Sequence, residues 1–223
     1  MARLPQALRG TPVGTTRLSR EELSERQLRR ILDGAVRVFA RRGFQDSTVD
    51  NIITAADVGV GSFYAHFDGK EECLDKVCER ISAEAGDALT RALDGGGWTE
   101  RFCDGMLALL RFAAANPLSA RVVLLEAQTG GPRVLARYGA MIDEIAAYLA
   151  QGREVSTLDR DWPPAFEEAT ASGLFWLLQS RLVRGELEEV DSLFAEMAEV
   201  ALEPYLGPAA TRRAVGAALA RAS

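Results

Sequence analysis

Apolar side chains recur at helical spacing along nearly the whole of this 223-residue chain after residue 18. In residues 20–42, for instance, Leu28, Ile31, Leu32 and Phe39 fall on one face of a helix. No segment alternates apolar and polar residues over the length of a strand. These patterns predict an all-α fold.

Capping residues mark both ends of the first helix. Ser19 and Glu22 have the spacing of a capping box, in which side chains bond to otherwise unpaired amides of the first turn. Gly43 suits the position just past a helix end. Residues 1–18 hold two prolines, two glycines and three arginines without apolar periodicity, so we expect a flexible basic tail there.

Two short helices are predicted next. Thr48 is a typical N-cap for a helix beginning at Val49, and the letters DVG form a tight turn before a helix over residues 60–67. Two short helices joined by a short turn and packed on a longer first helix form a helix-turn-helix, whose second short helix enters the major groove of DNA. We therefore expect a DNA-binding domain over residues 19–68.

The rest of the chain, residues 69–223, is predicted to be a larger helical domain. It begins with a long amphipathic helix over the stretch DGKEECLDKVCERISAEAGDALTRAL. Proline and glycine clusters separate the helices that follow. We place these helices near residues 98–115, 117–129, 131–151, 163–185, 188–206 and 208–221.

The charge is unevenly distributed along the chain. The net charge of −6 by itself argues against nucleic-acid binding. Residues 1–70, however, carry eleven basic and eight acidic residues, whereas residues 71–223 carry fifteen basic and 24 acidic ones. Such asymmetry indicates an end that faces a polyanion, although a solvated basic face would give the same counts.

Several classes of protein find no support in the sequence. Three cysteines are no disulfide framework and suggest a reducing compartment. There is no apolar signal segment and no uncharged apolar run of ~18 residues, so we expect a cytoplasmic protein without membrane contact. With one histidine, no glycine-rich phosphate loop and no nucleophile elbow, we expect no metal, cofactor or catalytic residue.

The stretch VGVGSFYAHF, residues 58–67, combines glycines, aromatic residues and the only histidine. Gly59 and Gly61 leave the helix entry without side chains, so the backbone can approach phosphate there. The longer stretch STVDNIITAADVGVGSFYAHFDGKEECL resembles the DNA-binding motif of TetR-type transcriptional repressors, and the resemblance is strong over residues 24–80. The matching positions are Thr48, Ile52, Ala55, Val58, Gly61, Ser62, Phe63, Tyr64, Phe67 and Lys70.

The resemblance implies contacts with double-stranded DNA. Phosphate contacts position a protein on DNA, and contacts with base edges give specificity. For Phe63, packing in the protein core is an equal alternative. The expected phosphate contacts are Thr48, Tyr64, His66 and Lys70, and the expected base contacts are Val60, Gly61, Ser62 and Phe63, with Gly59 at the helix entry.

Two positions depart from the family pattern. Asp57 replaces the usual glycine of the turn and is expected to adopt the left-handed conformation, which Asp tolerates better than most residues. Gly59 replaces a serine that would cap the second short helix and touch phosphate. One phosphate contact is then missing, so we expect either a modest operator affinity or compensation by the basic tail along the backbone or the minor groove.

The resemblance also implies how the second domain works. Two copies would form a two-fold homodimer through the helices near 163–185 and 188–206 and bind a palindromic operator. A small, mainly apolar effector would bind among the middle helices and release the repressor. The expected effector-binding residues are Phe102, Met106, Leu110, Arg121, Glu126, Tyr138, Met141, Phe175, Trp176 and Gln179.

Two other functions stay open. Free thiols such as Cys73 and Cys78 would make the same scaffold redox-responsive. These two cysteines are five residues apart, roughly 140° around a helix, so one chain could not hold an ion with both. The remaining alternative is a helical enzyme, but acidic pairs such as Glu167-Glu168 lie where a solvated helix face is expected.

Overall fold

The computed structural model describes residues 19–93 and 95–222, and these ranges contain helices joined by short loops, with no strand among them. The all-α prediction is confirmed, and the predicted tail over residues 1–18 lies outside the described residues. The elements are α1 (Arg20–Arg42), α2 (Val49–Ala56), α3 (Val60–Tyr64), α4 (Lys70–Ala92), α5 (Trp98–Ala115), α6 (Pro117–Arg121), the π-helical turn η1 (Val122–Glu126), the 3₁₀ turn η2 (Ala127–Thr129), α7 (Pro132–Ala150), α8 (Gly152–Val155), α9 (Phe166–Arg184), α10 (Val190–Leu206) and α11 (Pro208–Ala222).

Most helix boundaries agree with the sequence prediction, and the exceptions are local. The segment expected as one helix over 117–129 is divided into α6, η1 and η2. The second short helix ends at Tyr64 rather than at Phe67. The short helix α8 was not predicted, because Gly152 follows α7 almost directly, without a proline or polar cluster to mark a new element.

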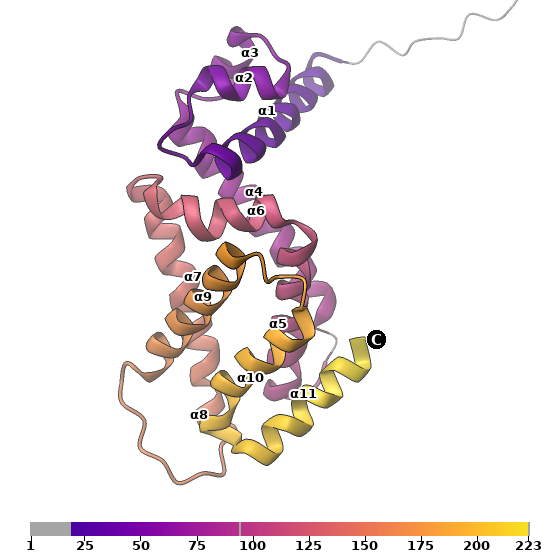
Figure 1. Ribbon diagram of the computed structural model, residues 1–223, viewed down its shortest axis with the longest axis vertical. Helices are drawn as coiled ribbons and strands as arrows, with labels where there is room; N and C mark the ends of the chain where they lie inside the picture. Colours follow the sequence, from indigo (N-terminus) through magenta and orange to yellow (C-terminus); the bar gives the residue numbers. More distant parts are fainter. Residues whose placement is uncertain (1–18, 94, 223) are drawn as a thin grey trace, which may run out of the picture.

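Figure 1 shows α1, α2 and α3 together at one end of an elongated molecule, which we call the head. α4 leads from the head into the larger helical bundle, and α6 lies at the junction between the two. No single described helix has the length and apolar composition of a membrane span. α5 and the segment Pro117–Thr129 together have that length and composition, but a bend of 105° separates them.

Two hydrophobic cores hold the helices together. The first joins α1, α2 and α3 to the beginning of α4, and Phe39, Ile52 and Phe63 are fully buried in it. Val122 of η1 belongs to the same core. The second core fills the larger bundle. The domain boundary after residue 68 stays a prediction, and the first core continues across it onto α4 and η1.

Within the head, the middle of α1 lies very close to the end of α2. A β-carbon at Gly34 would lie 2.9 Å from both the backbone nitrogen and the β-carbon of Ala56, so glycine allows the two helices to come this close. On either side, Arg30 donates to the Ala56 carbonyl (3.1 Å) and Arg37 to the Ala55 carbonyl (2.6 Å). The last four carbonyls of a helix have no partner inside it, so α1 caps α2 with its side chains.

Gly34→Ala is expected to destabilise the protein by about 1–3 kcal/mol, because the added methyl group would overlap the backbone of α2. Gly86→Ala is the matched control. Gly86 lies inside α4, with open space where a β-carbon would be. Alanine at this position should therefore raise the free energy of unfolding by about 0.5–1 kcal/mol. Urea unfolding measures both free energies, and equal effects would contradict the close approach of α1 and α2.

Candidate nucleic-acid interface

The amino end of α2 is exposed and carries a complete capping box. Thr48 Oγ1 accepts a hydrogen bond from the Asn51 amide (3.2 Å), and the Asn51 side chain accepts one from the Thr48 amide (3.2 Å). Arg42 at the end of α1 donates to the same Asn51 side-chain oxygen (2.9 Å). Thr48 thus occupies the N-cap position predicted for it, while its contact with phosphate stays a prediction.

The turn between α2 and α3 contains a residue with left-handed backbone. Asp57 has φ 52° and ψ 54°, the conformation predicted for it. One of its carboxylate oxygens lies 2.6 Å from an Arg30 guanidinium nitrogen, and Arg30 also caps α2. The negative charge that Asp57 brings to the turn is therefore paired within the head.

α3 presents a slim edge to solvent. Val60 and Tyr64, four residues apart and so on one face, are 55% and 56% exposed. Gly59 and Gly61 are also exposed, with no atom within 4 Å of where a β-carbon would be. Gly59 begins the helix without a side-chain cap, as expected where glycine replaces serine. An edge made of two glycines and two larger side chains suits insertion into a major groove.

Phe63 lies on the opposite face of α3, and its predicted base contact is wrong. Its side chain is fully buried, and its ring centre lies 5.4 Å from that of Phe67. Bringing the ring to a base edge would remove it from the core, at a cost of about 3 kcal/mol. Core packing, the alternative role, is the one that the structure shows. Ser62 and His66 are half-buried beside the exposed edge, and their contacts with DNA stay predictions.

Lys70 also departs from its predicted role as a phosphate contact. Its ammonium group donates to the carbonyls of Phe44 (3.0 Å), Gln45 (3.1 Å) and Ser47 (3.0 Å), and lies 4.6 Å from the centre of the Phe44 ring. An ammonium group has three donors, so all of them are used. Lys70 therefore ties the start of α4 to the loop between α1 and α2 and has no donor left for phosphate.

The same loop is bonded to the second domain. Glu126 of η1 accepts a hydrogen bond from the Phe44 amide (2.8 Å), and the Gln45 side chain donates to the Thr129 carbonyl (3.0 Å). Glu126 was predicted to bind the effector; one of its carboxylate oxygens is bonded to the head, and its contact with an effector stays a prediction. Neither contact was predicted, since their partners are more than eighty residues apart in the sequence.

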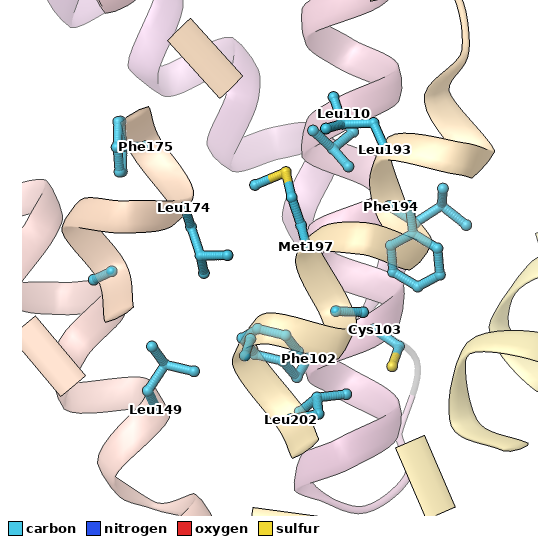
Figure 2. Close-up of a cluster of buried hydrophobic side chains, with 14 of the residues drawn as sticks. Phe102, Cys103, Leu110, Leu149, Leu174, Phe175, Leu193, Phe194, Met197 and Leu202 are labelled. Carbon is cyan, nitrogen blue, oxygen red and sulfur yellow. The ribbon is translucent and has the colours of Figure 1, made fainter. Parts of the chain in front are cut away.

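Most of the other predicted effector-binding residues gather in or beside the second core. Figure 2 shows its buried side chains, among them Phe102 and Met197. Gln179 donates to the Leu124 carbonyl in η1 (2.6 Å) and approaches the Tyr138 hydroxyl (3.4 Å). The predicted residues that belong to this core or pack against it are Phe102, Met106, Leu110, Tyr138, Met141 and Phe175.

Trp176 does not belong to this group. Its side chain is 64% exposed on α9, so its predicted place in an internal pocket is corrected. Arg121, at the end of α6, is half-buried and is not part of the second core. The sequence pattern could not show that Trp176 is exposed, because an aromatic side chain at helical spacing fits a core and an interface between subunits equally well.

The cysteines give little support to a redox role. All three are buried, and burial raises the pKa of Cys73 and of Cys78 to about 12 and that of Cys103 to about 11. Oxidants react with the thiolate, which is scarce at neutral pH when the pKa is this high. Within the described ranges, no three His, Cys, Asp or Glu residues are grouped as metal ligands would be.

The slim exposed α3, held by α1 and α2 at the end of an all-α molecule, defines a helix-turn-helix DNA-binding protein. The profile of the family described as "Bacterial regulatory proteins, tetR family" matches residues 31–77, from the middle of α1 into α4. Over these residues the chain is similar to the TetR family of transcriptional regulators, which together with the helix-turn-helix fold supports a regulator of this family. Regulators of this family are generally non-enzymatic DNA-binding proteins.

Individual relatives are more distant. The uncharacterised HTH-type transcriptional regulator YhgD of Bacillus subtilis (strain 168) is 25% identical over 142 residues, which are 63% of this chain and 74% of YhgD. The HTH-type transcriptional repressor KstR2 of Rhodococcus jostii (strain RHA1) is 45% identical, but only over 47 residues, 21% of this chain and 23% of KstR2. A crystal structure of a gamma-butyrolactone receptor (ArpA-like protein) has the same fold, with a TM-score of 0.67 and 20% identity over 88% of this chain and 96% of that one.

Lys70→Met is expected to lower the free energy of unfolding by about 2 kcal/mol, because three carbonyls would be left without their charged donor. Lys76→Met is the matched control. Lys76 is exposed and bonds only to Glu79 on its own helix, so its replacement should change stability by less than about 0.5 kcal/mol. Thermal unfolding without DNA compares the two variants. Equal stability of both would mean that Lys70 does not hold the loop.

Proposed function

We propose that this protein is a cytoplasmic transcriptional repressor that binds a palindromic DNA operator as a homodimer and is released by a small, mainly apolar effector. Each head would place α3 in the major groove of one half-site. The effector would bind in the second domain and favour a state in which the two heads no longer fit both half-sites. It can do so only by binding that state more tightly than the DNA-bound one.

The exposed edge of α3 carries the proposal. Val60 and Tyr64 are large side chains, more than half exposed, on a helix whose other face is buried in the first core. In a major groove, Val60 would contact thymine methyl groups, and the Tyr64 hydroxyl would donate to a phosphate oxygen.

An apolar stripe on α9 supports the dimer. Trp176 and Val183 are 64% and 65% exposed and seven residues apart, so they lie on the same face of the helix. Gly173, one turn from Trp176, has open space where a β-carbon would be, which allows a second helix to approach closely. Val200 of α10 is 47% exposed as well. Burial of this stripe against its copy would give an interface with one self-complementary patch on each subunit.

The effector site is proposed near the polar rim of the second core. Tyr138 packs edge-on against Phe175, with ring centres 5.5 Å apart, and the Gln179 amide approaches its hydroxyl. An apolar interior with a hydroxyl and an amide at its edge suits a ligand that is mainly apolar and has one or two polar groups. Gln179 is also bonded to η1, which is bonded to the head through Glu126, so a ligand at Gln179 would act on a continuous set of contacts.

Selection of bound duplexes from a random DNA pool tests the proposed function. The expected result is an enriched sequence with two-fold symmetry, which we call the selected duplex. A compound screen for release of the selected duplex then searches for the effector. Recovery of no sequence, or of one without symmetry, would count against a dimeric operator-binding protein.

Tyr64→Ala is expected to weaken binding to the selected duplex by about tenfold or more, since tenfold corresponds to about 1.4 kcal/mol. Val155→Ala is the control, because Val155 is similarly exposed (45%) but lies on α8, outside the head. Fluorescence anisotropy measures both dissociation constants. Wild-type affinity in the Tyr64 variant would remove this residue from the interface.

Trp176→Glu is expected to raise the dissociation constant of the dimer by about a hundredfold, because a central aromatic contact is worth at least about 2 kcal/mol and two like charges would then face each other. Leu135→Glu places the same charge at an exposed apolar position on α7 (53% exposed) and should leave the dimer intact. Sedimentation equilibrium separates monomer from dimer. If both variants stay dimeric, another surface forms the interface.

A further inference from the structure

The head has a second concave surface besides the edge of α3. A hollow of about 430 Å³ between α1 and α2 is lined by Arg37, Val38, Arg41, Arg42, Asn51, Thr54 and Ala55. We call it the α1–α2 hollow, and we propose that it binds the sugar-phosphate backbone of duplex DNA next to the bases that α3 contacts. This inference rests on the proposed function and adds a binding surface to it.

Three guanidinium groups line the α1–α2 hollow without an acidic partner in the described ranges. Arg37 donates to the Ala55 carbonyl (2.6 Å) and Arg42 to the Asn51 side-chain oxygen (2.9 Å), and both acceptors are uncharged. Arg41 is exposed and makes no hydrogen bond or ion pair with any described residue. No carboxylate belongs to the lining. The positive charge of this surface is therefore not neutralised by the fold.

Some arginines elsewhere in the described protein are paired with acidic residues, in contrast to those of the α1–α2 hollow. Asp33 of α1 is bonded to Arg80 of α4 (2.7 Å). A second hollow, of about 410 Å³ at the end of α9, has an acidic lining, and its Arg181 is paired with Glu186 (3.0 Å) and Glu196 (2.5 Å). Concentrated cationic charge in one concave surface of a protein with net charge −6 attracts a polyanion to that surface.

The position of the α1–α2 hollow favours DNA over a free anion. Asn51, which lines it, shares a capping box with Thr48, the predicted phosphate contact. Residues 48, 51 and 55 lie along one face of α2 by helical spacing. A DNA backbone that contacts Thr48 would continue along this face to Arg41 and Arg42, whose paired N–H donors match phosphate oxygens.

The salt dependence of DNA binding tests the inference. Removing one phosphate contact lowers the slope of log K against log salt by about 0.9, so Arg41→Gln/Arg42→Gln should lower it by about 1.8 per half-site on the selected duplex. Arg212→Gln/Arg213→Gln is the matched control, because it removes two exposed adjacent arginines from α11, outside the head. Arg41→Lys/Arg42→Lys keeps both charges and should keep the wild-type slope.

A wild-type slope in the Arg41/Arg42 glutamine variant would overturn the inference. An equal decrease in the Arg212/Arg213 variant would overturn it too, because net charge alone would then explain the effect. Thermal unfolding identifies any variant that fails to fold. If the double variant fails to fold, the single variant Arg41→Gln replaces it, because this substitution breaks no bond within the described protein. Its slope of log K against log salt is expected to decrease by about 0.9 per half-site. A wild-type protein that selects no duplex would instead overturn the proposed function itself.

Discussion

The contact between the middle of α1 and the end of α2 is the constraint on which the DNA-facing surface depends. Gly34 lets the two backbones meet, and Arg30 and Arg37 supply the donors that the last carbonyls of α2 need. Since α3 follows α2 after a short turn held by Asp57, the position of the α2 end also sets the direction of α3. A few charged hydrogen bonds, which are stronger than neutral ones, thus add to the first core in fixing the geometry of the small head.

The first core extends from the head onto α4 and η1, and hydrogen bonds join the same parts of the molecule. The loop between α1 and α2 is bonded to Lys70 on one side and to Glu126 on the other. Glu126 lies in a π-helical turn, and such turns frequently occur at functional sites. Gln179 bonds to the same turn from α9, the helix that bears the proposed dimer stripe. A change in the second domain would therefore reach the head through contacts and not through a flexible linker.

Much of the fold could be predicted from sequence because its signals are local. The capping box at Ser19, the N-cap at Thr48, the left-handed Asp57 and the ends of α1 and α5 follow from residues a few positions apart. The site was harder to predict. α3 has five residues, too few for periodicity to assign Phe63 to the inner face. Lys70 finds its carbonyl partners 23 to 26 residues away, and only the folded chain brings them together.

Hydrogen exchange of the backbone amides in Arg30→Gln/Arg37→Gln, without DNA, tests most directly whether α1 fixes α2 and α3. Both substitutions remove donors to the end of α2 and leave the first core's apolar side chains in place. The account predicts faster exchange over residues 57–67 than in the wild-type protein, with unchanged exchange in α9 and α10. Wild-type exchange rates over residues 57–67 would contradict it, because α3 would then keep its place without the arginines of α1.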